Sequence, residues 1–294
     1  MSPVNATAAP AARTSVRSRG QTTSLGTKLI TALTVVVAAI WFFPLYWAIV
    51  TSLKTDEETV RAGLRLLPEE PTLKGYLFVI QNSDLPIWYM NSVITSVIIT
   101  IVSVLMSAGA GYAISQLKFP GRQILWTLIL ASFMVPVSAL IVNHFIIIAG
   151  VKLLNTHLGI ILPMLITPVT VIVYKQFFDS VPREYREAAV IDNANEFQML
   201  FRIFLPMNWG VTTALAIITF IGAWNSFLWP FLAAQNEKMM TVTVGITAVQ
   251  DSYGVAFARV LAGAVLAGLP VALAYLLFQK RVTQAITLSA GIKG

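Results

Sequence analysis

The chain has 294 residues, of which 56% are hydrophobic and 11% charged, with a mean hydropathy of +0.75 and a net charge of +7. These values lie outside the range of soluble globular domains and indicate an integral membrane protein with several spans. The lack of cysteine excludes disulfides, thiolate metal sites and a cysteine nucleophile, and His144 and His157 are too far apart to suggest a zinc site. Since basic and aromatic residues do not interleave on a soluble face, the positive charge does not indicate nucleic-acid binding.

The N-terminal segment is rich in Ala, Ser, Thr and Pro with isolated Arg, which predicts a disordered tail over residues 1–27. The apolar run that follows is about 20 residues long, more than the roughly 7–15 of a secretory leader, so it predicts a retained anchor. A transmembrane domain is expected over residues 28–280, followed by a short polar tail over 281–294.

Six apolar runs are long enough to cross a hydrocarbon core of about 30 Å as helices, so the sequence predicts an all-α membrane protein. The predicted spans are Leu29–Val50, Ser92–Ser115, Ile124–Ile148, Leu158–Phe178, Trp209–Ala233 and Ala258–Phe278. With the N-terminus inside, most of the 20 Lys and Arg residues fall on the cytoplasmic side. The positive-inside rule therefore favours cytoplasmic termini at both ends of the chain.

Two polar segments lie between the spans. Residues 51–91 contain mixed charge and several prolines, and predict a small periplasmic cap. Residues 183–206 fall on the cytoplasmic side and have the apolar spacing of two short helices, broken at Asp192–Asn195. Two helices with a bend between them could fit a groove on another protein. The alternative is an amphipathic loop that lies in the headgroup layer.

The first predicted helix of this loop begins after Pro182, which suits a first helical turn, and Glu184 and Glu187 lie near its positive end. The face of this helix is formed by Tyr185, Ala188 and Ala189 at positions i, i+3 and i+4. The second helix repeats that spacing with Phe197, Leu200, Phe201 and Phe204, and stops at Leu205–Pro206.

The spans and loops lack two kinds of motif. No G-x-x-x-x-G-K-[ST] occurs, so the chain is not expected to be an enzyme that hydrolyses ATP by itself. The central parts of the spans hold no Asp or Glu, whereas ion-coupled carriers usually keep such groups inside the membrane. A lone His144 is more typical of an interfacial histidine than of a proton relay.

The loop closely resembles the EAA loop of permease subunits in bacterial ABC importers, through Glu187-Ala188-Ala189, then Asp192-Asn193-Ala194, then Ile203 to Pro206. Flanking segments extend this resemblance over nearly the whole chain after the tail, and Leu288–Gly294 is similar to the end of maltose-type permeases. The resemblance implies a type I ABC importer permease fold in the bacterial inner membrane. It also implies the carbohydrate-uptake group, with a sugar, oligosaccharide or sugar derivative as the favoured substrate and glycerol phosphate diesters or sulfonated glycosides as alternatives.

One position departs from the family pattern, because Asn193 replaces a glycine at the bend. Asn tolerates the left-handed backbone region better than other non-glycine residues. We therefore predict a positive φ at Asn193 and an intact bend.

The resemblance implies partners as well: a second permease, two ATPase subunits that carry ATP and Mg, and an external solute-binding protein. No cofactor is expected in this chain. Contact with the ATPase is expected from seven loop residues, with Glu187 as the main contact; the set is Tyr185, Glu187, Ala188, Ala189, Asp192, Asn193 and Ala194. The resemblance leaves two alternatives for the C-terminal tail, which is either disordered or inserted between the ATPase subunits.

Candidate substrate-path residues are Asn143, Trp224 and Asn225, because an indole can stack on a sugar ring and an amide can bond hydroxyls. The alternative for these residues is helix packing. Close-packing positions are predicted at Gly109, Gly111, Gly263 and Gly268, and kinks or gate-lining backbone at Met134, Pro136 and Pro163.

Two further classes of function remain open on the sequence. An ion-coupled secondary carrier would need no ATPase, and the missing intramembrane carboxylates count against it. A membrane-embedded enzyme would need a catalytic cluster, and the sequence offers no plausibly placed one.

Overall fold

The computed structural model describes residues 25–61, 63, 65–249 and 256–289, and these form helices joined by turns and loops. It divides into two compact units, residues 1–46 and 47–294. Helix α1 (Leu25–Ser52) supplies the described part of the first unit and runs into the second. The tail predicted over residues 1–27 lies outside the described residues as far as residue 24.

Among the described residues, three helices are long and apolar enough to cross a membrane unbroken, and these are α1, α4 (Leu85–Gln116) and α15, whose apolar part is Phe257–Gln279. Three further pairs of helices pass the same test together but are bent at a short break. Up to six spans follow if each bent pair is one span, which agrees with the number predicted from the sequence.

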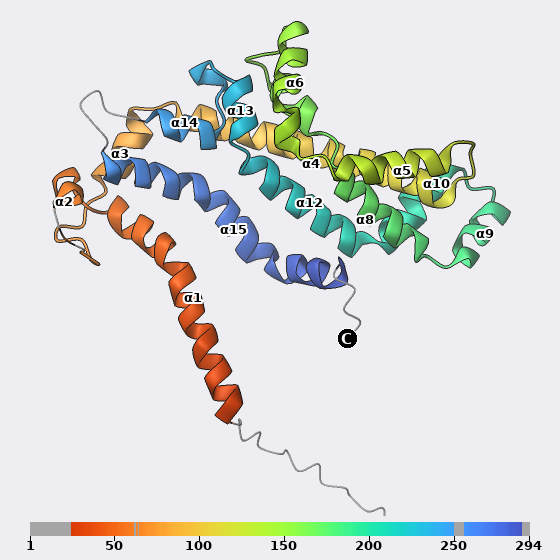
Figure 1. Cartoon of the computed structure of the whole chain (residues 1–294), viewed down its shortest axis with the longest axis horizontal. Coiled ribbons are helices and arrows are strands. Elements are labelled where there is room, and N and C mark those ends of the chain that lie inside the picture. The colour runs from red at the N-terminus through yellow and green to blue at the C-terminus, as the bar shows by residue number, and fades with distance from the viewer. Residues whose placement is uncertain (1–24, 62, 64, 250–255, 290–294) are drawn as a thin grey trace, which may run out of the picture. The chain divides into compact units, whose positions relative to one another are not determined.

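The second unit is built around α4. Helices α8 (Pro168–Asp179) and α12 (Trp209–Trp224) pack along α4, and α15 (Phe257–Ser289) packs against α12 and α3 (Lys74–Gln81) (Figure 1). Small residues at the α4 contact allow close approach. A Cβ added at Gly111 would lie 2.7 Å from the Tyr174 Cβ on α8, so the two backbones meet there.

The predicted cap over residues 51–91 contains α2 (Asp56–Val60) and α3. The span predicted to begin at Ser92 begins at Leu85 instead, so the cap is shorter than expected. Pro86 sits in the first turn of α4, where its missing N–H needs no partner. Asn91 and Ser92 are buried inside α4, where they bond to the segment that carries Lys238, Met240 and Val242.

The third span, predicted over Ile124–Ile148, is not one continuous helix. It consists of α5 (Arg122–Phe133) and α6 (Val137–Gly150), which meet at an angle of 102°. The kink predicted at Met134 and Pro136 is confirmed, because Pro136 is extended, with ψ 131°, and cannot donate to the preceding turn.

The fourth span is also bent, by 49°. It consists of α7 (His157–Ile161), a 3₁₀ turn (Leu162–Met164) and α8. The predicted kink residue Pro163 lies in the 3₁₀ turn, and the break follows it at Leu165–Thr167, since Pro168 forces Thr167 into an extended conformation.

The fifth span, predicted as Trp209–Ala233, ends earlier than expected. Helix α12 stops at Trp224, and after three intervening residues α13 (Leu228–Ala233) packs against α6 and α7. Pro230 falls within the first turn of α13, where a missing N–H is tolerated, so the polar Asn225-Ser226 pair becomes a break. An apolar run of sufficient length was therefore misread as one span.

At the other end of the chain, the tail predicted from residue 281 continues the helix of α15 as far as Ser289.

The predicted close-packing glycines divide into two groups. A Cβ at Gly111 or Gly263 would meet a neighbour within 3.3 Å, whereas one at Gly109 or Gly268 would meet nothing within 4 Å in the described chain. For Gly109 and Gly268 the prediction was wrong within this chain.

Candidate functional site

The loop predicted to contact an ATPase forms two helices. Helix α9 spans Arg183–Ile191, and Pro182 at its N-cap is extended, with ψ 138°. The pyrrolidine ring fixes φ near the helical value, so the chain enters the helix directly after Pro182. Glu184 in the first turn lies where the helix dipole favours a negative charge.

Helix α9 ends in a Schellman motif. The Ala194 N–H donates to the Ala189 carbonyl at 2.9 Å, and the Asn193 N–H donates to the Val190 carbonyl at 3.0 Å. Asn193 itself has φ 55°, in the left-handed region. The predicted positive φ is confirmed. Asn193 adopts the left-handed backbone conformation expected of the glycine at this position in the family pattern.

The second loop helix begins at Glu196, three residues after Asn193. Asn195 caps α10 (Glu196–Met199) in a capping box, in which the Asn195 side chain accepts from the Gln198 N–H and the Gln198 side chain accepts from the Asn195 N–H, each at 2.9 Å. The helix continues as a π-helical turn (Leu200–Phe204) and α11 (Leu205–Met207), then bends by 86° at Asn208 into α12. The bend between the two loop helices is therefore specified by local signals.

Aromatic side chains join the loop to the spans. Phe204 from the π-helical turn packs against Tyr112 of α4 and Phe178 of α8, with ring centroids 5.1 and 5.7 Å away and edge-on geometry. Tyr112 and Phe178 also contact each other edge-on at 6.2 Å. Such pairs contribute about 0.5–1.5 kcal/mol each beyond the burial of area. The second loop helix is thus anchored on two spans.

A polar cluster joins both loop helices to the same span. The Arg186 guanidinium on α9 donates to the Glu196 carboxylate on α10 at 2.8 and 3.2 Å, and to the Tyr112 hydroxyl at 3.0 Å. The Tyr112 hydroxyl in turn donates to Glu196. Tyr112 is 3% exposed, so its hydroxyl marks the point where the buried end of a span meets both helices of the loop.

The cluster changes the titration of its charged members. Burial alone would raise the pKa of Glu196, but hydrogen bonds from Tyr112 and Arg186 and the Arg186 charge outweigh it and lower the pKa. Burial alone would lower the pKa of Arg186, but its interactions with Glu196 and Tyr112 raise it. Both residues are therefore held in their charged forms.

The seven predicted coupling residues lie in different environments. Ala189 is 5% exposed and packs into the aromatic cluster, so it faces the chain's own core. Ala194 is half-buried beside it, while the rest of the set is exposed, namely Tyr185, Glu187, Ala188, Asp192 and Asn193. The Glu187 side chain makes no hydrogen bond or ion pair within the described residues and is free to meet a partner.

Large apolar side chains surround this exposed surface. Ile191 is 80% exposed and Phe197 77% exposed, on either side of the Asn193 bend. Apolar residues at a bend between two capped helices favour contact with another molecule over free solvation.

The three predicted substrate-path residues do not form one site. Asn143 is exposed on α6, and Asn225 is exposed at the end of α12. Trp224 is 2% exposed, packs against Tyr89 and Phe220, and its indole N–H donates to the Ala267 carbonyl at 3.2 Å. These contacts fit the packing alternative for Trp224.

The sequence interpretation missed the roles of Arg186 and Glu196. The two residues have opposite charges on the two predicted helices, but ten residues and a bend separate them. Only the folded bend, set by Asn193, brings the side chains together. A charge pair that spans a predicted helix break is the signal that could have indicated the contact.

Comparison with known proteins identifies the family. Residues 103–287 match the family model of the binding-protein-dependent transport system inner membrane component. The chain belongs to this family. The matched residues include the whole loop with α9 and α10, the helices α8 and α12, and most of α15.

Characterised permeases resemble the chain over most of its length. It is 29% identical to the arabinooligosaccharides transport system permease protein of Bacillus subtilis (strain 168), covering 90% of this chain and 95% of that protein. It is 32% identical to the sulfoquinovosyl glycerol transport system permease protein of Agrobacterium fabrum (strain C58 / ATCC 33970), covering 86% and 89%. The permease also resembles a solved bacterial ABC transporter involved in the import of alginate, with a TM-score of 0.77, 20% identity and coverage of 86% and 95%. The type I ABC importer permease fold is confirmed.

Proposed function

We propose that this permease forms, with a second permease, the membrane path of an ATP-driven importer for a sugar or sugar derivative. The two relatives named above are permeases of arabinooligosaccharides and sulfoquinovosyl glycerol transport systems, and this shared chemistry supports the carbohydrate class. A solute-binding protein delivers the substrate at the face that carries α2 and α3. Both termini lie in the cytoplasm, on the side of the loop.

Coupling to the ATPase is proposed to pass through the surface around Asn193. The observation that carries this proposal is the connection of an exposed bend to two buried span ends. Glu187, Ile191 and Phe197 present charge and apolar area outward, while Phe204 and the Arg186–Glu196 pair bind the same loop to Tyr112 and Phe178. A force on the bend would therefore reach α4 and α8 directly.

Two ATPase subunits with ATP and Mg complete the proposed assembly. Glu187 pairs with a basic group in an ATPase groove, and Ala188 lets the helix approach closely. The proposed substrate path includes Asn143 and Asn225, which are both exposed. The buried Trp224 contributes by packing against Tyr89 and Phe220 next to Asn225. The C-terminal segment from residue 281 extends toward the ATPase side.

The first test is affinity purification of the chain in mild detergent from its native membrane, with identification of co-purifying subunits and an ATPase assay. Recovery of a second permease, an ATPase subunit and a solute-binding protein is expected. A single species without ATPase activity in repeated preparations would contradict the proposal and favour an ion-coupled carrier.

A matched pair of variants tests the coupling residue. Glu187→Lys should abolish transport or uncouple hydrolysis, because it reverses the charge at the docking surface; removal of one partner from a partly desolvated pair costs about 2–5 kcal/mol. Glu184→Lys reverses the charge of another exposed carboxylate on α9 and should retain most transport. Normal transport in Glu187→Lys would refute the assigned role.

A further inference from the structure

A cavity lies beside the loop and shares Arg186 and Glu187 of α9 with the proposed coupling surface. The cavity has a volume of about 840 Å³ and is bounded by the end of α4, the start of α5, the end of α8 and helix α9. Five basic side chains and two acidic ones line it; these are Lys118, Arg122, Lys175, Arg183, Arg186, Asp179 and Glu187. The lining therefore carries an excess of positive charge.

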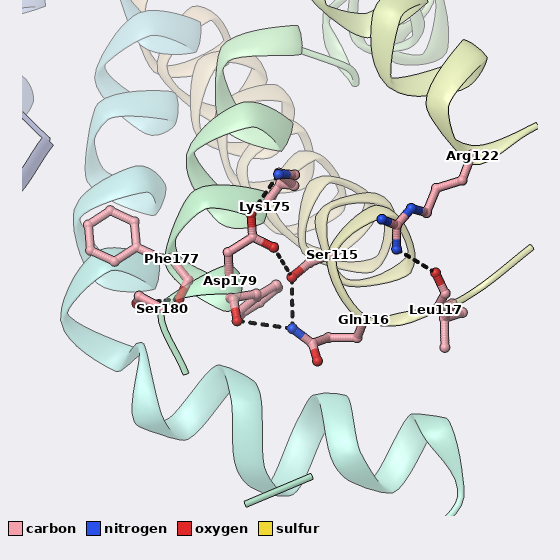
Figure 2. A network of polar contacts seen from close by, with 9 residues as sticks. Ser115, Gln116, Leu117, Arg122, Lys175, Phe177, Asp179 and Ser180 are labelled. Atoms are coloured by element: carbon pink, nitrogen blue, oxygen red, sulfur yellow. Dashed lines mark hydrogen bonds and ion pairs between the residues drawn. The ribbon is translucent and has the colours of Figure 1, made fainter. Parts of the chain in front are cut away.

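The pairing of these groups leaves most of that excess uncompensated. Lys175 forms an ion pair with Asp179 at 2.6 Å, and the other Asp179 oxygen accepts from Ser115 at 2.6 Å (Figure 2). In the part of the chain that the structure describes, Arg122 donates only to the Leu117 carbonyl, at 3.1 Å (Figure 2). Within the described residues, Lys118 and Arg183 have no ion pair or hydrogen bond from their side chains.

The floor of the cavity is held in place by the polar network. The Gln116 side chain donates to Ser115 at 2.8 Å and to the Phe178 carbonyl at 3.0 Å, which joins the ends of α4 and α8 (Figure 2). This network fixes Lys175 and Asp179 without using Lys118, Arg122 or Arg183. Cations that carry no structural contact with a carboxylate are available to bind an anion.

The surroundings of the cavity indicate the source of that anion. α4 is a candidate membrane span, and α5 and α8 each form half of a bent candidate span. The ends of these three helices meet at the cavity, and the end of a span is where a membrane protein faces the lipid headgroups. Lys175 Nζ lies 5.0 Å from the ring centroid of Trp126, and an aromatic beside a cation is typical of the membrane interface. Beyond Arg122, α5 exposes Ile124 at 69% and Leu128 at 60%.

We propose that this cavity binds the phosphate of an anionic phospholipid, with the acyl chains along the exposed apolar side of α5. Basic pockets between transmembrane helices on the cytoplasmic side recognise such headgroups. Lys118, Arg122 and Arg183 hold the phosphate, and Lys175 closes the pocket on the Trp126 side. The proposal goes beyond the transport function, since it concerns the lipid and not the cargo.

The test uses the purified full transporter and native mass spectrometry, titrated with phosphatidylglycerol, phosphatidylcholine or inorganic phosphate. Selective binding of phosphatidylglycerol is expected. In Lys118→Gln/Arg183→Gln its apparent affinity should fall roughly 30-fold, because each cation near a membrane surface contributes about 1 kcal/mol. The control Lys74→Gln/Lys238→Gln removes two exposed cations elsewhere and should bind as the wild type does.

Each other outcome overturns the proposal. Equal phosphatidylglycerol binding in all variants would exclude the cavity as the site. Binding of inorganic phosphate with no preference among lipids would indicate a free anion, and loss of the ATPase subunit with unchanged lipid binding would indicate a protein contact. If the double variant does not assemble, the single variant Lys118→Gln replaces it, because Lys118 is an exposed loop residue. Its apparent affinity for phosphatidylglycerol should fall roughly fivefold.

Discussion

At the residue scale, the shape of the loop depends on Asn193, whose backbone lies in the left-handed region. The Schellman hydrogen bonds of Ala194 and Asn193 require this conformation. An amide side chain tolerates it, whereas a β-branched side chain does not. A single residue type thus decides where α9 ends and in which direction the chain continues.

Substitutions at Asn193 should separate backbone from side-chain effects. Asn193→Gly should raise the melting temperature slightly or leave it unchanged, because glycine adopts positive φ without cost. Asn193→Val should lower stability by about 1–2 kcal/mol, the cost of a left-handed backbone for such residues. Thermal unfolding of the detergent-solubilised complex measures both. A valine variant as stable as the wild type would refute the bend's dependence on Asn193.

The Arg186–Glu196 pair gives a pH-dependent prediction. Because the pKa of Glu196 is lowered in the folded chain, its stabilising contribution is present above the ordinary carboxyl pKa and is lost as pH falls through the lowered value. Glu196→Gln should cost about 1 kcal/mol or less near neutral pH, since the Glu196 side chain is 45% exposed. Melting temperatures of both forms from pH 7 down to acid measure it. The difference should shrink at low pH, and a constant difference would contradict the ionic contribution.

At the element scale, the sequence predicted the loop better than the spans. The loop helices were predictable because Pro182, Asn193, Asn195 and Pro206 are local signals, each acting within a few residues. The spans were predicted by length and hydropathy, which do not distinguish a straight helix from two bent ones. The separate α13 packs against α6 and α7, so tertiary contacts contribute to its position, whereas the 102° bend between α5 and α6 lies at Pro136, a local signal.

The contact between α4 and α8 gives a prediction with a control in the same helix. Gly111→Ala should destabilise the permease by about 1–3 kcal/mol, because its Cβ would lie 2.7 Å from the Tyr174 Cβ and 3.0 Å from the Lys175 nitrogen. Gly109→Ala, two residues earlier, meets nothing within 4 Å. Expression level and thermal stability compare the two. Equal behaviour of the two variants would mean that the helices are not in close contact at Gly111.

At the scale of the whole molecule, the second unit contains three separate buried clusters. One joins the loop to the spans around Phe178, a second surrounds Trp88 and Val242, and a third surrounds Trp229 between α13 and its neighbours. The sequence could predict that such apolar residues are buried, but not how they divide. That division depends on which helices cross, which local patterns do not specify.

Separate clusters predict additive energetics. Phe178→Leu and Val242→Ala should each cost about 1–3 kcal/mol, and the double variant should show the sum within about 0.5 kcal/mol. Phe178→Leu with Phe204→Leu should deviate from the sum by more, because their rings are 5.7 Å apart. Melting temperatures of the three single and two double variants provide the comparison. Strong coupling between Phe178 and Val242 would show that the clusters act as one.

The hydrogen bonds of the Tyr112 hydroxyl determine whether the loop could be exchanged between permeases. The bend and the helix caps of residues 182–206 are determined by residues within the loop, so the segment would fold similarly in a different permease. Its attachment to the spans also needs a residue outside the loop, because Arg186 and Glu196 both bond to the Tyr112 phenol, 74 and 84 residues earlier in the chain. A loop transferred to another permease would therefore keep its backbone conformation. It would lack these hydrogen bonds to the span unless the recipient has a tyrosine at the position equivalent to Tyr112.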